Sequence, residues 1–282
     1  GNVVNTCVTV HPGWEKRLEA LYGGCWGGAV TGTARVVMNC KVPEGDGFNV
    51  ASLYGGNDFT GNVYRSILTV NDGRYQNIYG GGNGDYGPGK DAKYLQDTTY
   101  TFGTMTAAVP VPNSQFPVIN FNNGIVTQNM YGGGNIGTCI VKDTLTTVGA
   151  GYPNLEDYAL VQVNVHGGTF KNNIFAGASG RNAEKGTRPL IHGLKMLNMD
   201  NGLVRQSVYG GTESLDDGYK QECKDSTHSD GALNKTTLRP SSILNLTGGT
   251  VMNNVYGAGY LGNVYGSVYV NIGQEAVNTS RV

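Results

Sequence analysis

The chain has 282 residues, a formal net charge of −1, 39% hydrophobic residues and only 15% charged residues. Its length excludes a small scaffold held together by disulfides, and the lack of a basic stripe removes the electrostatic basis for binding nucleic acid. Glycine accounts for 45 residues without a collagen period, and 17 tyrosines are too many for a disordered linker. We therefore expect an ordered β protein, and no apolar run in it is long enough to span a bilayer.

The first elements in chain order are less regular than those that follow. Residues 6–13 (TCVTVHPG) alternate like a strand that ends in a turn. The stretch 14–21 (WEKRLEAL) has apolar residues at helical spacing and fits either a short helix or a bulged strand. Two loose copies of a repeat are centred on 21–25 and 53–57.

Five clear copies of the repeat occupy 68–82, 119–134, 163–178, 197–212 and 244–259. Each begins with an apolar-x-apolar step, such as Ile119 and Phe121, which indicates a strand, and an Asn, Asp or Gly turn follows. A second short strand then ends in an aliphatic residue, an aromatic residue and Gly-Gly or Ala-Gly. The pattern predicts at least two short strands per repeat.

The spacing of the aromatic residue decides between two repeat folds. This residue stands at Tyr22, Tyr54, Tyr79, Tyr131, Phe175, Tyr209 and Tyr256. The shortest interval, from Tyr54 to Tyr79, is 25 residues, which accommodates two or three strands but not the four strands of a propeller blade. We therefore predict an all-β parallel β-helix, or β-solenoid, of about seven coils stacked roughly 4.8 Å apart, with a β-propeller as the alternative.

Longer intervals are interpreted as coils that carry loop insertions on one side of the solenoid. These insertions are placed at 83–118, 135–158, 179–194 and 213–241. They hold most of the charged residues and prolines, and their acids, including Glu213, are interpreted as solvated loop charges. We treat residues 1–282 as a single solenoid domain.

The residues around each aromatic position define a corner of the coil. Glycine follows the aromatic residue at Gly80, Gly132, Gly210 and Gly257. There we expect either a positive φ or a close approach of two backbones. An Asn or Ser column precedes the corner at Asn77, Asn129, Asn173, Ser207 and Asn254. Two interpretations of this column stay open: a ladder of amide-to-amide hydrogen bonds inside the bend, or turn residues on the outside.

No motif predicts a catalytic, cofactor-binding or metal-binding residue. The GxGxxG match at 82–87 is followed by Pro88 and Gly89 rather than by the helix that a dinucleotide site requires. The four histidines lie far apart, and none has a second ligand at metal-site spacing. The alternative activity is cleavage of a glycan by paired carboxylates in a groove, for which the strand copies carry few acids.

The repeat GGTVMNNVYGAG at 248–259 resembles the glycine-rich β-helix repeats of large surface-exposed or secreted proteins of gut and oral Bacteroidota, often described as adhesin-like. The resemblance covers nearly the whole chain and implies a right-handed parallel β-helix without a catalytic residue set. It implies a non-catalytic extracellular or cell-surface solenoid that acts as a stalk, adhesin or filament component and presents its insertions to a partner. A glycan-active lyase or hydrolase of the β-helix type stays the alternative.

The expected partners are neighbouring repeats of the same longer chain or another copy, and glycans or proteins on host or bacterial surfaces. The alternation at Val268, Val270 and Ile272 continues the strand pattern towards the C-terminal end. We therefore expect further coils of the same chain, or of another chain, beyond Val282.

Two kinds of covalent modification fit such a location. Candidate O-glycosylation positions follow an aspartate in the insertions, a pattern similar to the acceptor of Bacteroidota envelope proteins. They are Thr98, Thr144 and Ser226. We also expect one disulfide among Cys7, Cys25 and Cys40, because stacked coils bring Cβ atoms near the ~3.8 Å that a bridge needs.

Overall fold

The structure is a computed structural model. It describes residues 1–14, 17–84, 100–102, 105–107, 112–137, 139, 159–181, 191, 193–214, 240–261, 264 and 267–273. These residues contain strands and no helix. The short strands β7 (Tyr100–Phe102) and β8 (Met105–Ala107) form a separate antiparallel pair. All other strands belong to one sheet in which every pairing is parallel.

The first column of strands runs the length of the solenoid. Its members are β1 (Thr6–Val10), β3 (Val30–Met38), β5 (Asn62–Val70), β9 (Asn113–Phe121), β12 (Ala159–Phe170), β14 (Gly193–Val204), β16 (Pro240–Leu246) and β19 (Ser267–Ile272). Each pairs in parallel with the next. Strands distant in sequence therefore become direct neighbours in space.

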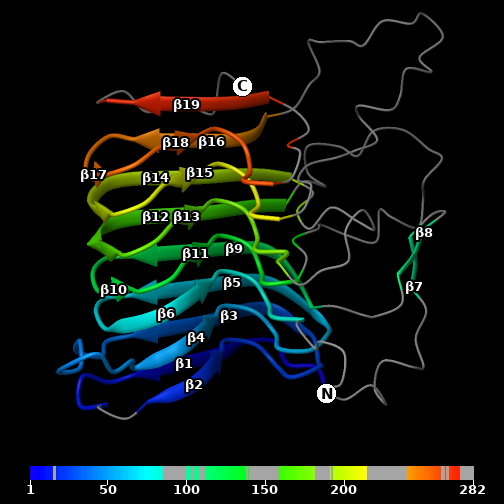
Figure 1. Cartoon of the computed structure of the whole chain (residues 1–282). Coiled ribbons are helices and arrows are strands. Elements are labelled where there is room, and N and C mark those ends of the chain that lie inside the picture. The colour runs from blue at the N-terminus through cyan, green and yellow to red at the C-terminus, as the bar shows by residue number, and fades with distance from the viewer. Residues whose placement is uncertain are drawn as a thin grey trace, which may run out of the picture.

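The second column carries the aromatic corner residues. Its members are β2 (Leu18–Tyr22), β4 (Val50–Tyr54), β6 (Arg74–Tyr79), β11 (Met130–Tyr131), β13 (Ile174–Phe175), β15 (Val208–Tyr209) and β18 (Val255–Tyr256). The short strands β10 (Ile125–Val126) and β17 (Thr250–Val251) lie between the two columns and pair with β6, β12 and β14. The described strands thus make seven coils, and β19 opens an eighth (Figure 1).

The observed pairing is that of an all-β parallel solenoid, as the repeat spacing predicts. A propeller would instead require antiparallel blades of four strands. The helical interpretation of 14–21 is wrong in its second half, because β2 begins at Leu18 and pairs in parallel with β4. Three of the ranges that we expected to be insertions include, at their C-terminal ends, the first residues of a strand. These strands are β9, which begins at Asn113, β14, which begins at Gly193, and β16, which begins at Pro240.

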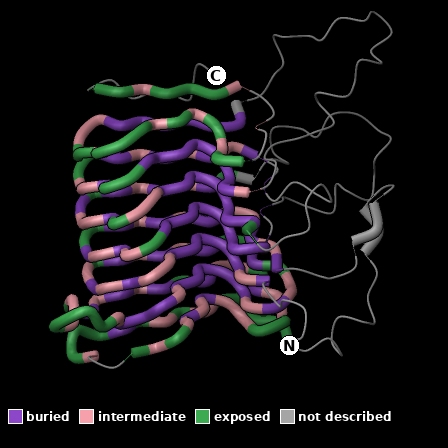
Figure 2. The backbone as a smooth tube through the Cα atoms, in the orientation of Figure 1, coloured by how far each residue is buried: buried purple, intermediate pink, exposed green. Residues whose placement is uncertain are grey.

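The core is a stack of equivalent apolar side chains inside the coils. Leu68, Ile119, Val163, Leu197 and Leu244 are paired in register from one coil to the next, and each is fully buried. Figure 2 shows the buried residues as a continuous stack through the coils. Because alternate residues of a strand point to opposite faces, the residues between these apolar positions lie on the outer face.

One such outer column is a ladder of asparagine amides that sequence analysis missed. Each side-chain Nδ2 donates to the Oδ1 of the preceding coil at 2.9 Å, through Asn120, Asn164, Asn198 and Asn245. These residues are the middle positions of the apolar-x-apolar steps. The signal was therefore present as a repeated Asn between two apolar residues.

The Asn and Ser column before the corner also forms a ladder, but of another kind. The Oδ1 of Asn77 accepts from the backbone N–H of Asn129 at 3.2 Å, and the Oδ1 of Asn129 accepts from that of Asn173 at 3.1 Å. The same pattern continues through Ser207 and Asn254. The ladder is therefore formed by side chain-to-backbone hydrogen bonds, not by the amide-to-amide bonds that one interpretation expected.

Close backbone approach explains the corner glycines Gly80, Gly132 and Gly210, whereas a Cβ on Gly257 would meet the side chains of Val268 and Val270. None of Gly80, Gly132, Gly210 and Gly257 has a positive φ, so the left-handed alternative is wrong at these positions. A Cβ on Gly132 would collide with the carbonyl oxygen of Ala176 and lie 2.8 Å from methyl groups of Val161 and Val163. Positive φ values occur at the opposite turn, for example 122° at Gly124.

We predict that Gly132→Val destabilises the fold by more than about 1 kcal/mol, because the added side chain overpacks the corner against the next coil. The control is Gly13→Val, since a Cβ at Gly13 meets no atom within 4 Å. Denaturant unfolding measures both variants. Equal stability of the two would contradict the close-approach explanation.

Candidate functional site

A single column of stacked aromatic rings follows the second column of strands. Its seven members are Tyr22, Tyr54, Tyr79, Tyr131, Phe175, Tyr209 and Tyr256. Adjacent ring centroids lie 4.7–5.2 Å apart, and adjacent ring planes differ by only 6–11°. The separation is the coil spacing, so in-register strand pairing alone places these rings face to face.

Strand alternation places this column outside the apolar core. Ile78 is buried in the core, so the next residue, Tyr79, points to the opposite face of β6. Each inner ring is nonetheless shielded by the rings above and below it, and Tyr131 is only 2% exposed. The column therefore offers ring edges rather than ring faces to its surroundings.

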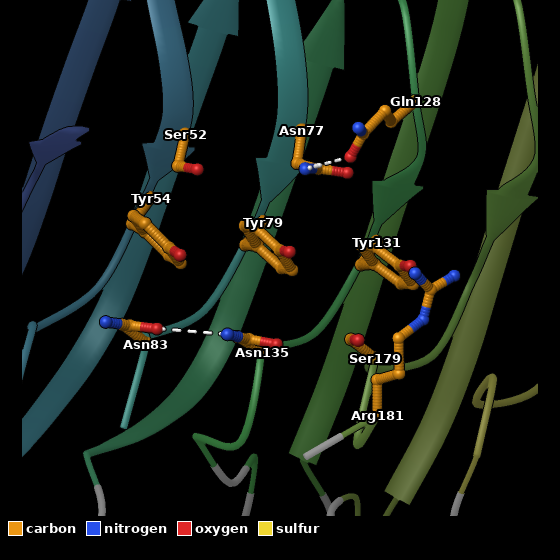
Figure 3. Close-up of a pocket in the computed structure, with 10 residues that line it drawn as sticks. All are labelled: Ser52, Tyr54, Asn77, Tyr79, Asn83, Gln128, Tyr131, Asn135, Ser179 and Arg181. Carbon is orange, nitrogen blue, oxygen red and sulfur yellow. Dashed lines mark hydrogen bonds between the residues drawn. The ribbon is translucent and has the colours of Figure 1, made fainter. Parts of the chain in front are cut away.

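A polar groove with a volume of about 330 Å³ lies along the middle of the column. We call it the tyrosine groove. It is lined by Ser52, Tyr54, Asn77, Tyr79, Asn83, Gln128, Tyr131, Asn135, Ser179 and Arg181. Figure 3 shows the rings of Tyr54, Tyr79 and Tyr131 side by side, with polar side chains flanking them on both sides.

The first wall of the groove comes from residues that precede the aromatic position in each coil. Ser52, Asn77 and Gln128 form it, and Asn77 Nδ2 donates to Gln128 Oε1 at 2.8 Å. Gln128 is exposed, whereas Asn77 also accepts a backbone N–H in the corner ladder. The wall thus connects the exposed amide of Gln128, through Asn77, to the hydrogen-bonded ladder before the corner.

The second wall comes from residues four positions after the aromatic residue. Their backbones pair in parallel from coil to coil. The N–H group of each residue donates to a carbonyl oxygen in the previous coil, that of the residue just before its counterpart there. The residues of this column are Asp58, Asn83, Asn135, Ser179 and Glu213, of which Asn83, Asn135 and Ser179 line the groove. Asn83 Nδ2 donates to Asp58 Oδ1 at 3.0 Å, and Asn135 Nδ2 donates to Asn83 Oδ1 at 3.1 Å.

Glu213 closes one end of this wall. Tyr131 Oη donates to Glu213 Oε2 at 2.6 Å, and Arg181 donates from Nη2 to Glu213 Oε1. The Glu213 side chain is only 8% exposed, whereas that of Arg181 is 61% exposed. The interpretation of Glu213 as a solvated loop charge is therefore wrong, because coil pairing carries this residue onto the groove wall. Its fixed offset of four from Tyr209 is the signal that would have found it.

The electrostatics of this cluster follow from burial and charge. Burial, reinforced by the neighbouring Glu213 carboxylate, raises the pKa of Tyr131 well above its usual range. The hydrogen bond to Glu213 raises the pKa of Arg181. Tyr131 therefore stays a neutral hydrogen-bond donor, and the exposed guanidinium is balanced by a buried carboxylate.

The cysteines at the N-terminal end are not joined in the structure. Cys7, Cys25 and Cys40 are free thiols. Cys7 is exposed, whereas Cys40 is fully buried, with its Sγ 3.9 Å from Tyr75 Oη, and burial raises the pKa of its thiol. A bridge between these two would require side chains on opposite faces of the coil to meet.

The remaining candidate positions add no site. Thr98, Thr144 and Ser226 lie outside the described residues. His166 is half-exposed, with its Nδ1 2.7 Å from Asp200 Oδ2. Within the described ranges, His, Cys, Asp and Glu side chains form no group of three that could hold a metal ion. The same part of the chain has no helix of a length and apolarity suited to crossing a membrane.

Comparison of the chain with family profiles, with curated proteins and with solved structures gave no match.

We predict an energetic coupling between Tyr131 and Glu213. A double-mutant cycle with Tyr131→Phe and Glu213→Gln should give an interaction of at least about 1 kcal/mol, because the phenol donates to a buried carboxylate. Tyr131→Phe combined with Asn71→Ala, in the separate amide contact between Asn71 and Asn39, should be additive. A coupling no larger than that of the control pair would show that the Tyr131–Glu213 contact contributes nothing to stability.

The raised pKa of Tyr131 predicts a loss of stability in alkali. Above pH ~10 the unfolded chain releases the phenol proton while the folded chain retains it. The folded state then binds more protons, so the unfolding free energy falls as pH rises. Tyr131→Phe should reduce this slope by up to about 1.4 kcal/mol per pH unit, measured by denaturant unfolding across alkaline pH. Identical slopes for the two proteins would contradict the burial argument.

Proposed function

We propose that this chain is a non-catalytic binding solenoid, a stalk or adhesin, that holds an extended partner in the tyrosine groove. The observation that carries the proposal is the continuity of the groove across coils. Its walls repeat equivalent polar side chains at the spacing of the aromatic column, 4.7–5.2 Å. A repeating surface of this kind is suited to a repeating ligand.

The rigidity of the groove supports a binding role. Tyr54, Tyr79 and Tyr131 are held by paired strands, and each ring is fixed by its neighbours. Asn83 and Asn135 are held by backbone pairing and by their own amide contact. Binding therefore orders few side chains, which lowers the entropic cost of association.

The positions of the acids support a non-catalytic role. Asp58 and Glu213 are four coils apart on the same wall, about 19 Å at the usual strand spacing. Glycosidases that use two carboxylates hold them roughly 5–10 Å apart. The observation that favours the alternative, a glycan-active enzyme, is the burial of Glu213 beside the groove.

The extracellular or cell-surface placement, and the filament role, rest on the resemblance of the repeat to surface proteins of Bacteroidota. The free thiols of Cys7, Cys25 and Cys40 add no support to an oxidising location. Presentation of a partner by the long insertions concerns residues that lie mostly outside the described ranges.

Adhesion measurements test the binding role. Beads that carry the chain are washed over surfaces coated separately with cell-surface polysaccharide and with cell-surface protein. We expect retention on one of them that Gln128→Ala weakens and that Gln162→Ala leaves unchanged. Gln162 is the matched control, because it lies on β12, outside the groove lining. Absence of retention, or retention that is equal for both variants, would reject the proposal.

A product assay tests the alternative enzyme. Incubation of the chain with soluble polysaccharides should release no reducing ends and no unsaturated products. Product release that Glu213→Gln abolishes, in a variant that still unfolds cooperatively, would replace the binding function by a catalytic one.

A further inference from the structure

The chemistry of the tyrosine groove restricts what it binds. The described residues of its lining offer hydroxyl and amide groups, which both donate and accept hydrogen bonds, and one guanidinium. The aromatic residues present their edges, because their faces are stacked on one another. The part of the groove that the structure describes therefore has no apolar pocket and no open ring face.

An extended peptide does not fit this arrangement. Alternate side chains of a peptide strand repeat every ~6.6 Å and are recognised by separate pockets. The groove repeats at the 4.7–5.0 Å separation of Tyr54, Tyr79 and Tyr131, and its described lining forms no such pockets. The two periods fall out of register within a few coils.

The charges on the described residues of the groove disfavour a polyanion. Among the described lining residues Arg181 alone is charged, and its guanidinium is paired with Glu213. A second carboxylate, that of Asp58, contacts the wall residue Asn83. An anionic polymer would therefore meet two carboxylates against one guanidinium, whereas nucleic-acid binding requires an excess of cationic groups. Nucleobases would also lack open ring faces on which to stack.

We infer that the tyrosine groove binds a neutral polysaccharide that runs along the solenoid axis. In an extended glycan, such as one joined by β-1,4 linkages, each pyranose residue advances the chain by a length close to the coil spacing, so successive sugar rings meet equivalent side chains of successive coils. Sugar hydroxyl groups both donate and accept, as do Asn, Gln, Ser and Tyr side chains. This inference rests on the proposed binding function and names the ligand class of the same groove.

Gln128 is the residue at which to test the site. It is exposed, and its side chain accepts a hydrogen bond from Asn77 without taking part in the backbone pairing, so its loss leaves the coil pairing intact. Affinity electrophoresis through gels that contain soluble glucans, xylans or mannans measures binding to neutral polymers. Gels that contain polygalacturonate or heparin measure binding to anionic ones.

We expect retardation by at least one neutral polymer and by neither anionic polymer at physiological salt. Gln128→Ala should weaken the neutral interaction by about three- to tenfold, the effect of one lost neutral hydrogen bond. Gln162→Ala, on the outer face of β12, should bind like the parent chain. Loss of affinity in both variants, or in neither, would place the glycan elsewhere and overturn the inference.

A variant that changes the charge beside the groove provides a second test of the ligand class. Glu213→Gln leaves the exposed Arg181 guanidinium without its carboxylate. We expect this variant to gain retardation by polygalacturonate that salt suppresses. Thermal unfolding checks that it is folded, and Arg181→Gln in the same background should remove the gain. A folded Glu213→Gln variant without this gain would show that Arg181 does not face the ligand and would overturn the charge argument.

The outcomes separate this inference from the proposed function. If the parent chain prefers the anionic polymers, and Gln128→Ala weakens that binding, the groove is a binding site and only the ligand class is wrong. Bead retention on protein alone, weakened by Gln128→Ala, has the same meaning. Failure to bind any neutral polymer of the panel overturns the inference, while the adhesion assay decides the proposed function independently.

Discussion

In-register parallel pairing between equivalent strands is the constraint on which the rest of this structure depends. Each coil repeats the backbone of the one before it at one strand spacing, so a residue at a given place in the coil lies directly over its counterpart. Apolar residues then form a continuous core, amides form ladders, and rings form a stack. The function of each position is set by its column more than by its neighbours in sequence.

The corner of the coil shows how tightly this constraint acts. A carbonyl oxygen of the next coil occupies the space where a side chain of Gly80 or Gly210 would begin. The residue before each of these glycines is a tyrosine whose ring stacks on its counterparts. Close backbone approach at the glycine and close ring approach at the aromatic position therefore have the same origin. The stacking also makes the groove polar, because the apolar ring faces contact one another and do not face the groove.

The cluster of Tyr131, Glu213 and Arg181 departs from this regularity. A buried carboxylate replaces the Asn or Ser of the preceding coils and takes one hydrogen bond from a phenol and one from a guanidinium. A buried charge is tolerated when its oxygens are paired in this way. The substitution places a balanced ion pair towards one end of the wall, whereas the carboxylate of Asp58 lies at the other end.

The sequence by itself determined the all-β solenoid, the number of coils and the residues of the aromatic column. It could do so because repeat length limits how many strands a coil holds, and because equal phase in each repeat requires stacking. The fixed offset of Asp58, Asn83 and Asn135 from the aromatic residue was also present in it.

Only the tertiary structure decided why the corner glycines are needed, how the asparagines bond, and that Glu213 is buried beside Tyr131. A repeat pattern gives the order of residues along one coil, whereas these features depend on atoms of the adjacent coil. Residues 131 and 213 are 82 positions apart, and insertions of unequal length separate them. Their contact follows from coil stacking and from no local pattern in the chain.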